Sequence, residues 1–333
     1  MLSPTGDDRI RLVAMAISLA VSVGLLAAKF QAYRLTGSTA ILSDALESIV
    51  NVVAAGFAIA ALLFAHRPAD RNHPYGHGKM EFLSAAFEGG LIAFAAVLII
   101  YEAVQGLVNG VTLRSLDVGM VVVLGAGLVN LALGFFLLRT GRRYDSLTLV
   151  ADGRHVLSDF YTSAGIVVGL LLVSVTGITW LDPLVALVVA LNLMWKGVRL
   201  IRQASAGLLD EEDTALLDRL LAVLEPHLGQ GVIRVHHLRA IRSGRFHHVD
   251  AHLVVPEFWT VERSHELAED LGERVVKELG VEGEMILHTD PCHRIYCRMC
   301  DLDDCPVRRE PFSGRPRLTL DEAVQPDMPR GRP

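Results

Sequence analysis

Six stretches of the chain are long and apolar enough to cross a lipid bilayer. Crossing the hydrocarbon core takes roughly 20 mostly apolar residues in helical form, and each stretch approaches or exceeds that length with few charges inside it. We therefore predict a membrane α-helical fold with a six-transmembrane-helix bundle, whose spans are Leu12–Phe30, Ala40–Ala65, Phe82–Val108, Val118–Leu138, Leu147–Val175 and Leu181–Leu200.

Basic residues are distributed unevenly between these stretches. An even number of spans places both termini on one side of the membrane, and Lys and Arg accumulate on the cytoplasmic side. The segments on the side of the termini carry most of the basic residues, whereas the opposite loops offer only Arg34 and Arg114. We predict an integral protein of a bacterial-type inner (cell) membrane, in contact with lipid, with cytoplasmic N- and C-termini.

After Ala206 the pattern changes to that of a soluble domain. Its amphipathic periodicity and alternating positions predict the order α-β-β-α-β, a small sheet covered on one face by helices, as in ferredoxin-like or metallochaperone-like domains. The predicted elements are a helix at Thr214–His227, strands at Val232–Arg242 and His247–Val255, a helix at Val261–Leu279 and a strand at Met285–Asp290.

The expected domain organisation has four parts. Residues 1–205 form the transmembrane domain and residues 206–291 a cytoplasmic domain for metal binding and dimerisation. Residues 292–307 hold a cysteine cluster. Residues 308–333 contain five prolines and scattered arginines, a composition typical of disorder.

Composition argues against one class of function, and the lack of catalytic motifs argues against another. The chain is 51% hydrophobic with a formal net charge of −6, so it lacks the basic character of a nucleic-acid-binding protein, and we expect no nucleic-acid partner. It also contains no nucleotide-binding loop and no nucleophile with a plausible base. We therefore predict that it is not an enzyme.

Two of the predicted spans, the second and the fifth, each contain a pair of candidate metal ligands. Positions i and i+4 share one helix face, so Glu47 lies over Asn51 and His155 over Asp159. Ionisable groups at membrane depth are costly unless paired or metal-bound, and one divalent cation would cancel two carboxylate charges. Protons would neutralise the site without the metal, so metal binding would release them. We predict a four-ligand metal site with metal–proton exchange; the alternative is that these residues only hydrogen-bond the helices together.

Two further groups of ligands lie outside the spans. Asp70, His73 and His77 fall within eight residues, in a loop where Pro74 and Gly76 favour a turn. They predict a metal site, or else a solvated loop that carries histidines by chance. On the predicted strand His247–Val255, the core positions alternate with ligand-capable ones, and His252 is on the ligand-capable face.

The chain has four cysteines, all located after the last predicted strand. Cys292, Cys297, Cys300 and Cys305 have the spacing C-x4-C-x2-C-x4-C. Cytoplasmic thiols stay reduced, which favours metal ligation over disulfides. Four soft ligands suit a structural, tetrahedral Zn²⁺ or Cu(I). An iron–sulfur cluster, from the partial match to plant-type ferredoxins, and metal-free surface thiols are the alternatives.

From Arg11 to Cys292 the chain resembles the cation diffusion facilitator family. Besides His155 and Asp159, the matching motifs are Thr36-Gly37-Ser38, the loop DRNHPYGHGKME from Asp70 to Glu81 and the strand ILHTDPC from Ile286 to Cys292. The resemblance implies a Y-shaped homodimer that exports divalent metal from the cytoplasm by alternating access, usually coupled to proton entry.

The resemblance also assigns roles to individual residues. It implies a transport site, a loop site, two neighbouring sites in the C-terminal domain that share Asp290, and a charge pair that interlocks the protomers. The transport site consists of Glu47, Asn51, His155 and Asp159, and the loop site of Asp70, His73 and His77. In the C-terminal domain, His236 and His252 bind one metal with Asp290, and His265 and His288 bind the neighbouring one with the same Asp290. The charge pair is Lys79 with Asp210.

One departure from the family concerns the choice of metal. The usual pair in the second span is His or Asp followed by Asp, whereas this chain has Glu47 and Asn51. Asp44, one turn before Glu47, is a further candidate carboxylate for the site; because the family often has Asp at this position, a structural role is at least an equal expectation. We expect efflux of a divalent transition-metal ion, with Zn²⁺ the first choice and Fe²⁺ the second, and metal ions also acting as regulatory ligands. The alternative is a non-transporting metal-sensing membrane scaffold of the same fold.

Overall fold

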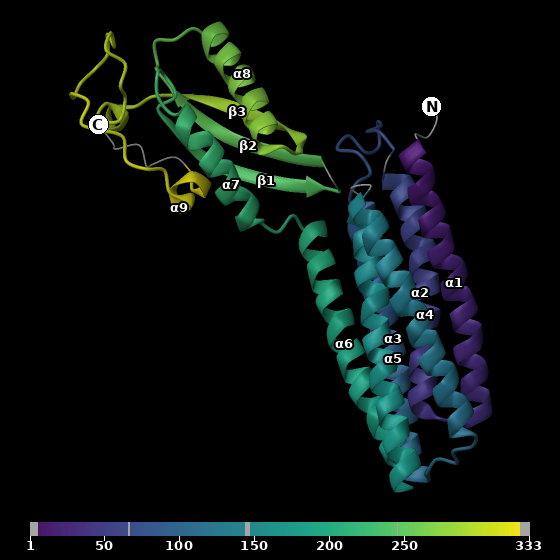
Figure 1. Ribbon diagram of the computed structural model, residues 1–333. Helices are drawn as coiled ribbons and strands as arrows, with labels where there is room; N and C mark the ends of the chain where they lie inside the picture. Colours follow the sequence, from purple (N-terminus) through teal and green to yellow (C-terminus); the bar gives the residue numbers. More distant parts are fainter. Residues whose placement is uncertain (1–5, 66, 144–146, 245, 327–333) are drawn as a thin grey trace. The chain divides into compact units, whose positions relative to one another are not determined.

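The computed structural model describes residues 6–65, 67–143, 147–244 and 246–326 (Figure 1). The chain divides into two compact units. The first contains residues 1–61 and 83–205, and the second contains residues 62–82 and 206–333. The loop with Asp70, His73 and His77 therefore belongs to the same unit as the C-terminal domain.

The first unit is an antiparallel bundle of helices, as predicted. Within the described residues, six helices are long and apolar enough to span a membrane. Several extend beyond the predicted apolar stretches, because helical hydrogen bonding continues into the polar flanks. Their bounds are α1 Gly6–Thr36, α2 Thr39–Ala65, α3 Met80–Asn109, α4 Leu116–Arg143, α5 Leu147–Thr176 and α6 Leu181–Leu208.

The outer surface of the bundle is apolar. Large apolar side chains such as Phe94, Val121 and Val188 are more than half exposed and would face lipid. The helical backbone satisfies its own polar groups, as the lipid interior requires. The bundle therefore buries its polar side chains between helices rather than on its surface.

The Thr36-Gly37-Ser38 motif forms the tight turn from α1 to α2. Gly37 has φ +65°, a conformation that glycine adopts without strain. The hydroxyl of Ser38 accepts a hydrogen bond from Ile41 N at 3.1 Å, and Asp182 of α6 accepts from Thr39 N at 2.7 Å. Side chains thus cap the start of α2, the helix that carries Glu47 and Asn51.

Close contact between α4 and α5 depends on glycine. A Cβ atom at Gly153 would lie 2.9 Å from Leu138 N, and one at Gly134 would lie 2.7 Å from the Leu157 Cγ. Small residues let membrane helices approach closely, so these glycines fix α5, and with it His155 and Asp159, against α4.

The second unit has the predicted α-β-β-α-β order. β1 and β2 are antiparallel, β2 and β3 are parallel, and the strand order is β1-β2-β3. The helices α7 and α8 share one hydrophobic core with one face of the sheet, and the alternating residues Val249, Ala251, Leu253 and Val255 are buried there as expected. The bounds are α7 Thr214–Leu224, β1 Arg234–Ser243, β2 Phe246–Val255, α8 Val261–Leu279 and β3 Glu282–Pro291.

The C-terminal segment differs from the expectation of disorder. Residues 308–326, the C-terminal strap, end in the short helix α9 (Leu320–Val324), and Leu318 and Ala323 are buried in the core beside α7. Glu322 pairs with Arg234 of β1 at 2.7 Å. Composition misled the prediction because a few apolar residues suffice to dock a segment on an existing core. The rest of the predicted tail, 327–333, lies outside the described residues.

Candidate metal centres

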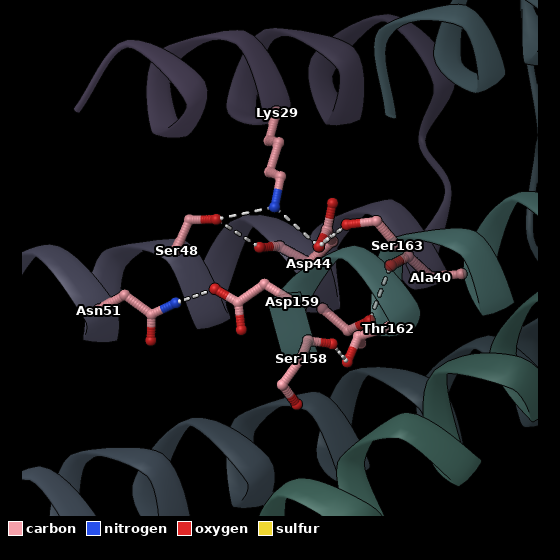
Figure 2. Close-up of polar contacts among 10 residues, drawn as sticks. Lys29, Ala40, Asp44, Ser48, Asn51, Ser158, Asp159, Thr162 and Ser163 are labelled. Carbon is pink, nitrogen blue, oxygen red and sulfur yellow. Dashed lines mark hydrogen bonds and ion pairs between the residues drawn. The ribbon is translucent and has the colours of Figure 1, made fainter. Parts of the chain in front are cut away.

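The first candidate centre lies between α2 and α5. Asn51 Nδ2 of α2 donates to Asp159 Oδ2 of α5 at 2.8 Å (Figure 2). Glu47 and Asp159 are 7% and 8% exposed, and Glu47 Oε2 and Asp159 Oδ1 are buried without a hydrogen-bond partner in the described part of the chain. Buried carboxylate oxygens without a donor are costly, so the site is chemically suited to a cation.

His155 lies one turn before Asp159 on α5, partly buried. The acidic side chains that act on it electrostatically are, in order of strength, Asp159, Glu88 of α3 and Glu47. Glu47, His155 and Asp159 thus act on one another electrostatically. Their ligand atoms are not all within 4.8 Å of one another in the described residues, so metal binding would have to draw them together. Two carboxylates, one imidazole and one amide are a ligand set that suits a divalent transition-metal ion.

A buried ion pair that the sequence did not reveal lies beside this centre. Lys29 Nζ of α1 contacts Asp44 Oδ1 of α2 at 2.9 Å and Ser48 Oγ at 3.1 Å. Ser163 of α5 donates to Asp44 Oδ1 at 3.0 Å. Figure 2 shows the two clusters side by side along α2, so Asp44 and Asn51 each link α2 to α5. Lys29 lies inside the first predicted span, but only the tertiary contact identifies Asp44 of the next helix as its partner.

The loop residues form a second centre. The ligand atoms of Asp70, His73 and His77 lie within 4.8 Å of one another. Asp70 Oδ1 accepts from the backbone N–H of His73 at 2.7 Å and from that of Asn72 at 2.8 Å, and these backbone hydrogen bonds lower the pKa of Asp70. Asp70 and His73 are half exposed and His77 is buried. The turn therefore presents an ionised carboxylate between two imidazoles.

The sheet carries the third centre. Asp290 Oδ2 of β3 lies 2.8 Å from His252 Nδ1 of β2 and 3.3 Å from His236 Nε2 of β1, and its Oδ1 lies 3.4 Å from His288 Nε2. The ligand atoms of His236, His252 and Asp290 are all within 4.8 Å of one another. The strand register explains this convergence, because His236 pairs with His252 and His252 with His288.

His265 is not brought to this centre. Its Nε2 lies 3.4 Å from Glu269 Oε1 on the same exposed face of α8. The neighbouring site of His265, His288 and Asp290, which the resemblance implies, is therefore represented in this structure only by His288 and Asp290. An exposed i,i+4 pair on a helix explains the position of His265 without a metal.

His237 is a further residue of this region that sequence reasoning missed. A bulge interrupts the β1–β2 register between His236 and Arg239, and His237 has φ +54°, which turns its Nδ1 to 3.4 Å from His252 Nε2. Partial burial and then the Arg239 guanidinium lower the pKa of His237. The adjacent pair His236-His237 was the available signal, but a bulge breaks the alternation that assigns faces.

The predicted interlocking residues pair within one chain. Lys79 Nζ lies 2.8 Å from Asp210 Oδ2, and both side chains are more than a third exposed. The four cysteines line one cavity after β3.

Two models of known protein families match this chain, and together they cover the residues of all three candidate centres. Residues 15–209 match the family model described as the cation efflux transmembrane domain, and residues 213–292 match that of the cation efflux protein, cytoplasmic domain. All three candidate centres thus lie within the matched segments, whereas three of the four cysteines lie beyond them.

Relatives from bacteria and plants agree with these matches. The uncharacterized transporter sll1263 of Synechocystis sp. is 37% identical over 276 residues, covering 83% of this chain and 88% of that protein. The cation-efflux pump FieF of Pectobacterium atrosepticum is 30% identical, covering 84% and 93%, and metal tolerance protein C1 of Arabidopsis thaliana is 30% identical, covering 83% and 61%. The chain belongs to the cation efflux, or cation diffusion facilitator, family, and is an integral membrane protein with a C-terminal cytoplasmic domain.

Proposed function

We propose that this protein exports a divalent transition-metal ion from the cytoplasm in exchange for protons. The ion is the substrate and binds Glu47, Asn51, His155 and Asp159. The observation that carries the proposal is the pair of buried carboxylates, each with an oxygen lacking a hydrogen-bond partner in the described residues. Ionisable groups at membrane depth mark ion pathways in membrane proteins.

Charge balance accounts for the exchange. A bound M²⁺ ion cancels the charges of Glu47 and Asp159, and protons cancel them when the ion has left, so the two kinds of cation compete for the same oxygens. Alternating access of this one site to the two sides of the membrane then couples metal exit to proton entry. The exporter works as a homodimer in a bacterial-type inner membrane, with both termini in the cytoplasm.

Zn²⁺ is the expected substrate and Fe²⁺ the second choice. His155 and Asp159 provide one nitrogen and one carboxylate, which Zn²⁺ binds readily. Asn51 supplies an amide oxygen where a second carboxylate is usual, and an oxygen-rich set also accepts harder ions such as Fe²⁺.

Metal flux through the purified protein in proteoliposomes tests this function. With an imposed pH gradient and a panel of Zn²⁺, Fe²⁺, Co²⁺, Ni²⁺, Cd²⁺ and Mn²⁺, we expect saturable flux that responds to the direction of the gradient. Flux that ignores the gradient would remove proton exchange from the proposal. Absence of flux for every ion would favour the alternative, a metal-sensing scaffold, in which the Asn51–Asp159 hydrogen bond simply closes the site.

We further propose that metal in the cytoplasmic domain favours the transport-competent dimer. His236, His252 and Asp290 bind it, and the loop residues Asp70, His73 and His77 hold another ion. This regulatory step predicts that flux at limiting metal falls when the cytoplasmic site is removed.

Asp290→Asn is expected to weaken metal binding to the cytoplasmic site by at least roughly 10- to 100-fold. Removing a residue that only hydrogen-bonds a metal ligand typically costs this much, and Asp290 is itself a proposed ligand. One carboxylate contacts His236, His252 and His288, so one substitution affects all three. Calorimetric titration of the full-length protein measures the lost site. His227→Ala is the matched control, because His227 pairs with Glu278. Unchanged binding in Asp290→Asn would refute the assignment, and a loss with His265→Ala would restore His265 to the site.

A further inference from the structure

The segment after β3 is packed onto the sheet rather than free. It begins at Cys292, whose backbone N–H donates to Val255 O at 2.7 Å, and forms a short 3₁₀ helix at Arg294–Tyr296. Tyr296 and Cys300 are 2% and 6% exposed and form a buried cluster with Ile233 and Val254. Val254 points away from the core shared with α7 and α8, so this segment covers the opposite face of the sheet.

All four cysteines of the protein line a single cavity in this segment. The cavity has a volume of about 510 Å³, and Cys292, Cys297, Cys300 and Cys305 contribute to its wall together with His293. All four are free thiols. The four cysteines lie within the 14 residues 292–305, and the chain has none elsewhere, so every thiol of the protein is concentrated at this cavity.

Backbone and guanidinium hydrogen bonds hold the loops that carry these cysteines. Cys297 N donates to Arg294 O and Cys300 N to Tyr296 O, both at 3.1 Å. The Arg308 guanidinium donates to the carbonyl oxygens of Cys297 at 3.3 Å and Cys300 at 3.1 Å, and also to that of Leu302. Arg308, which also lines the cavity, therefore holds the turn between Cys297 and Cys300 in place.

The spacing and the ligand type identify the class of metal. Successive cysteines are separated by four, two and four residues, and each interval falls in the range common for pairs of zinc ligands. A complete set of four protein sulfurs leaves no open coordination position, which is the character of a structural site. In a plant-type ferredoxin the fourth ligand lies much further along the chain.

We propose that Cys292, Cys297, Cys300 and Cys305 bind one structural Zn²⁺ ion. Within the described residues only the loop and sheet centres bring three ligand atoms within 4.8 Å of one another, so binding draws the four thiols inward from the cavity wall. Neither the family match, which ends at residue 292, nor the proposed transport reaction assigns this site. The inference is therefore independent of metal export.

The site has a structural consequence for the C-terminal strap. The strap leaves this segment on one face of the sheet and buries Leu318 and Ala323 in the core on the other face. Arg315 ties the two regions together, because it contacts Asp301 at 3.0 Å and Leu228 O at 2.6 Å. A zinc ion at the start of the strap restrains the chain where it begins to pass from one face to the other.

Cobalt substitution in the full-length protein, purified under reducing conditions, tests the site. Tetrahedral thiolate ligation gives a sulfur-to-cobalt charge-transfer absorption that oxygen and nitrogen sites do not give. We expect one such Co²⁺ per chain, displaced by Zn²⁺, absent in Cys297→Ser/Cys300→Ser and retained in the matched His236→Ala/His252→Ala variant. No thiolate absorption in the wild type, its persistence in the cysteine variant, or iron and sulfide in the protein as purified would overturn the proposal.

Proteolysis of the unaltered protein gives a second readout that needs no variant. Trypsin cleavage after Arg309 or Arg317 requires the strap to open; Arg315 is not a cleavage site because Pro316 follows it. Because ligand binding to the closed form alone reduces opening by a factor of 1 + [L]/Kd, free zinc at 100 times Kd is expected to slow cleavage roughly 100-fold. A cleavage rate that zinc does not change would contradict a zinc-restrained strap.

Discussion

Asp159→Asn is expected to reduce metal flux on the order of 100- to 1,000-fold. The substitution keeps the size of the side chain and removes one of the two charges at the candidate transport site. A unit charge pair at 4 Å in a partly buried site is worth about 4 kcal/mol, and about 1.4 kcal/mol corresponds to a tenfold change in an equilibrium constant. Proteoliposome flux, measured with the same protein-to-lipid ratio for each variant, tests the expectation.

The same helix offers a matched control for this loss. Asp152 is half-buried two turns before Asp159 on α5, and it accepts a hydrogen bond from Ser18 at 2.9 Å. Asp152→Asn makes the identical chemical change outside the set of four ligands, so it should retain most of the flux. Equal losses in both variants would mean that α5 fails to pack without its carboxylates, and wild-type flux in Asp159→Asn would place the transport site elsewhere.

Local sequence spacing predicted much of the fold and several members of each centre. The spans were recognisable because lipid demands long apolar helices, and Glu47 with Asn51 followed from the i,i+4 rule. Alternation in β2 correctly separated Val249 and its neighbours in the core from His252 on the other face. These predictions use only neighbours along the chain, where geometry is fixed by the helix or strand itself.

The features that sequence reasoning missed depend on contacts between distant segments. Lys29 carries no local signal for a partner 15 residues away in another helix, and His237 acquires its position from a bulge. Residues 308–326 have the composition of a disordered segment, yet Leu318 is buried because α7 and the sheet provide the core. In each case the deciding partner is made by tertiary packing, which composition and periodicity do not describe.

Lys29→Met is expected to lower the free energy of unfolding by roughly 3–5 kcal/mol, the cost of leaving one partner of a buried ion pair unpaired. Lys29 and Asp44 are 2% and 1% exposed, so neither water nor lipid headgroups can solvate the remaining charge. Asp44→Asn should cost a similar amount, because it leaves the ammonium group without its counter-ion. Equilibrium unfolding in mixed micelles measures both variants.

The double variant Lys29→Met/Asp44→Asn separates ion pairing from simple packing. It removes both charges together, so it should be more stable than either single variant, and the double-mutant cycle should show a favourable coupling between the two sites. Additive losses would show that the charges do not stabilise one another and that the side chains matter only for their volume.

Measuring the metal affinity of Lys29→Met, Asp44→Asn and the double variant tests independently whether Lys29 and Asp44 act on the transport site through their charges. Asp44, Glu47 and Asp159 together with Lys29 carry a formal charge of −2 when all are ionised, which a divalent ion cancels. The double variant keeps this total, whereas Lys29→Met makes it −3 and Asp44→Asn makes it −1. If Lys29 and Asp44 act on the site through charge, Asp44→Asn should weaken metal binding more than the double variant does. If the pair serves only to hold α1 against α2, metal affinity should instead follow stability, and both single variants should lose it together.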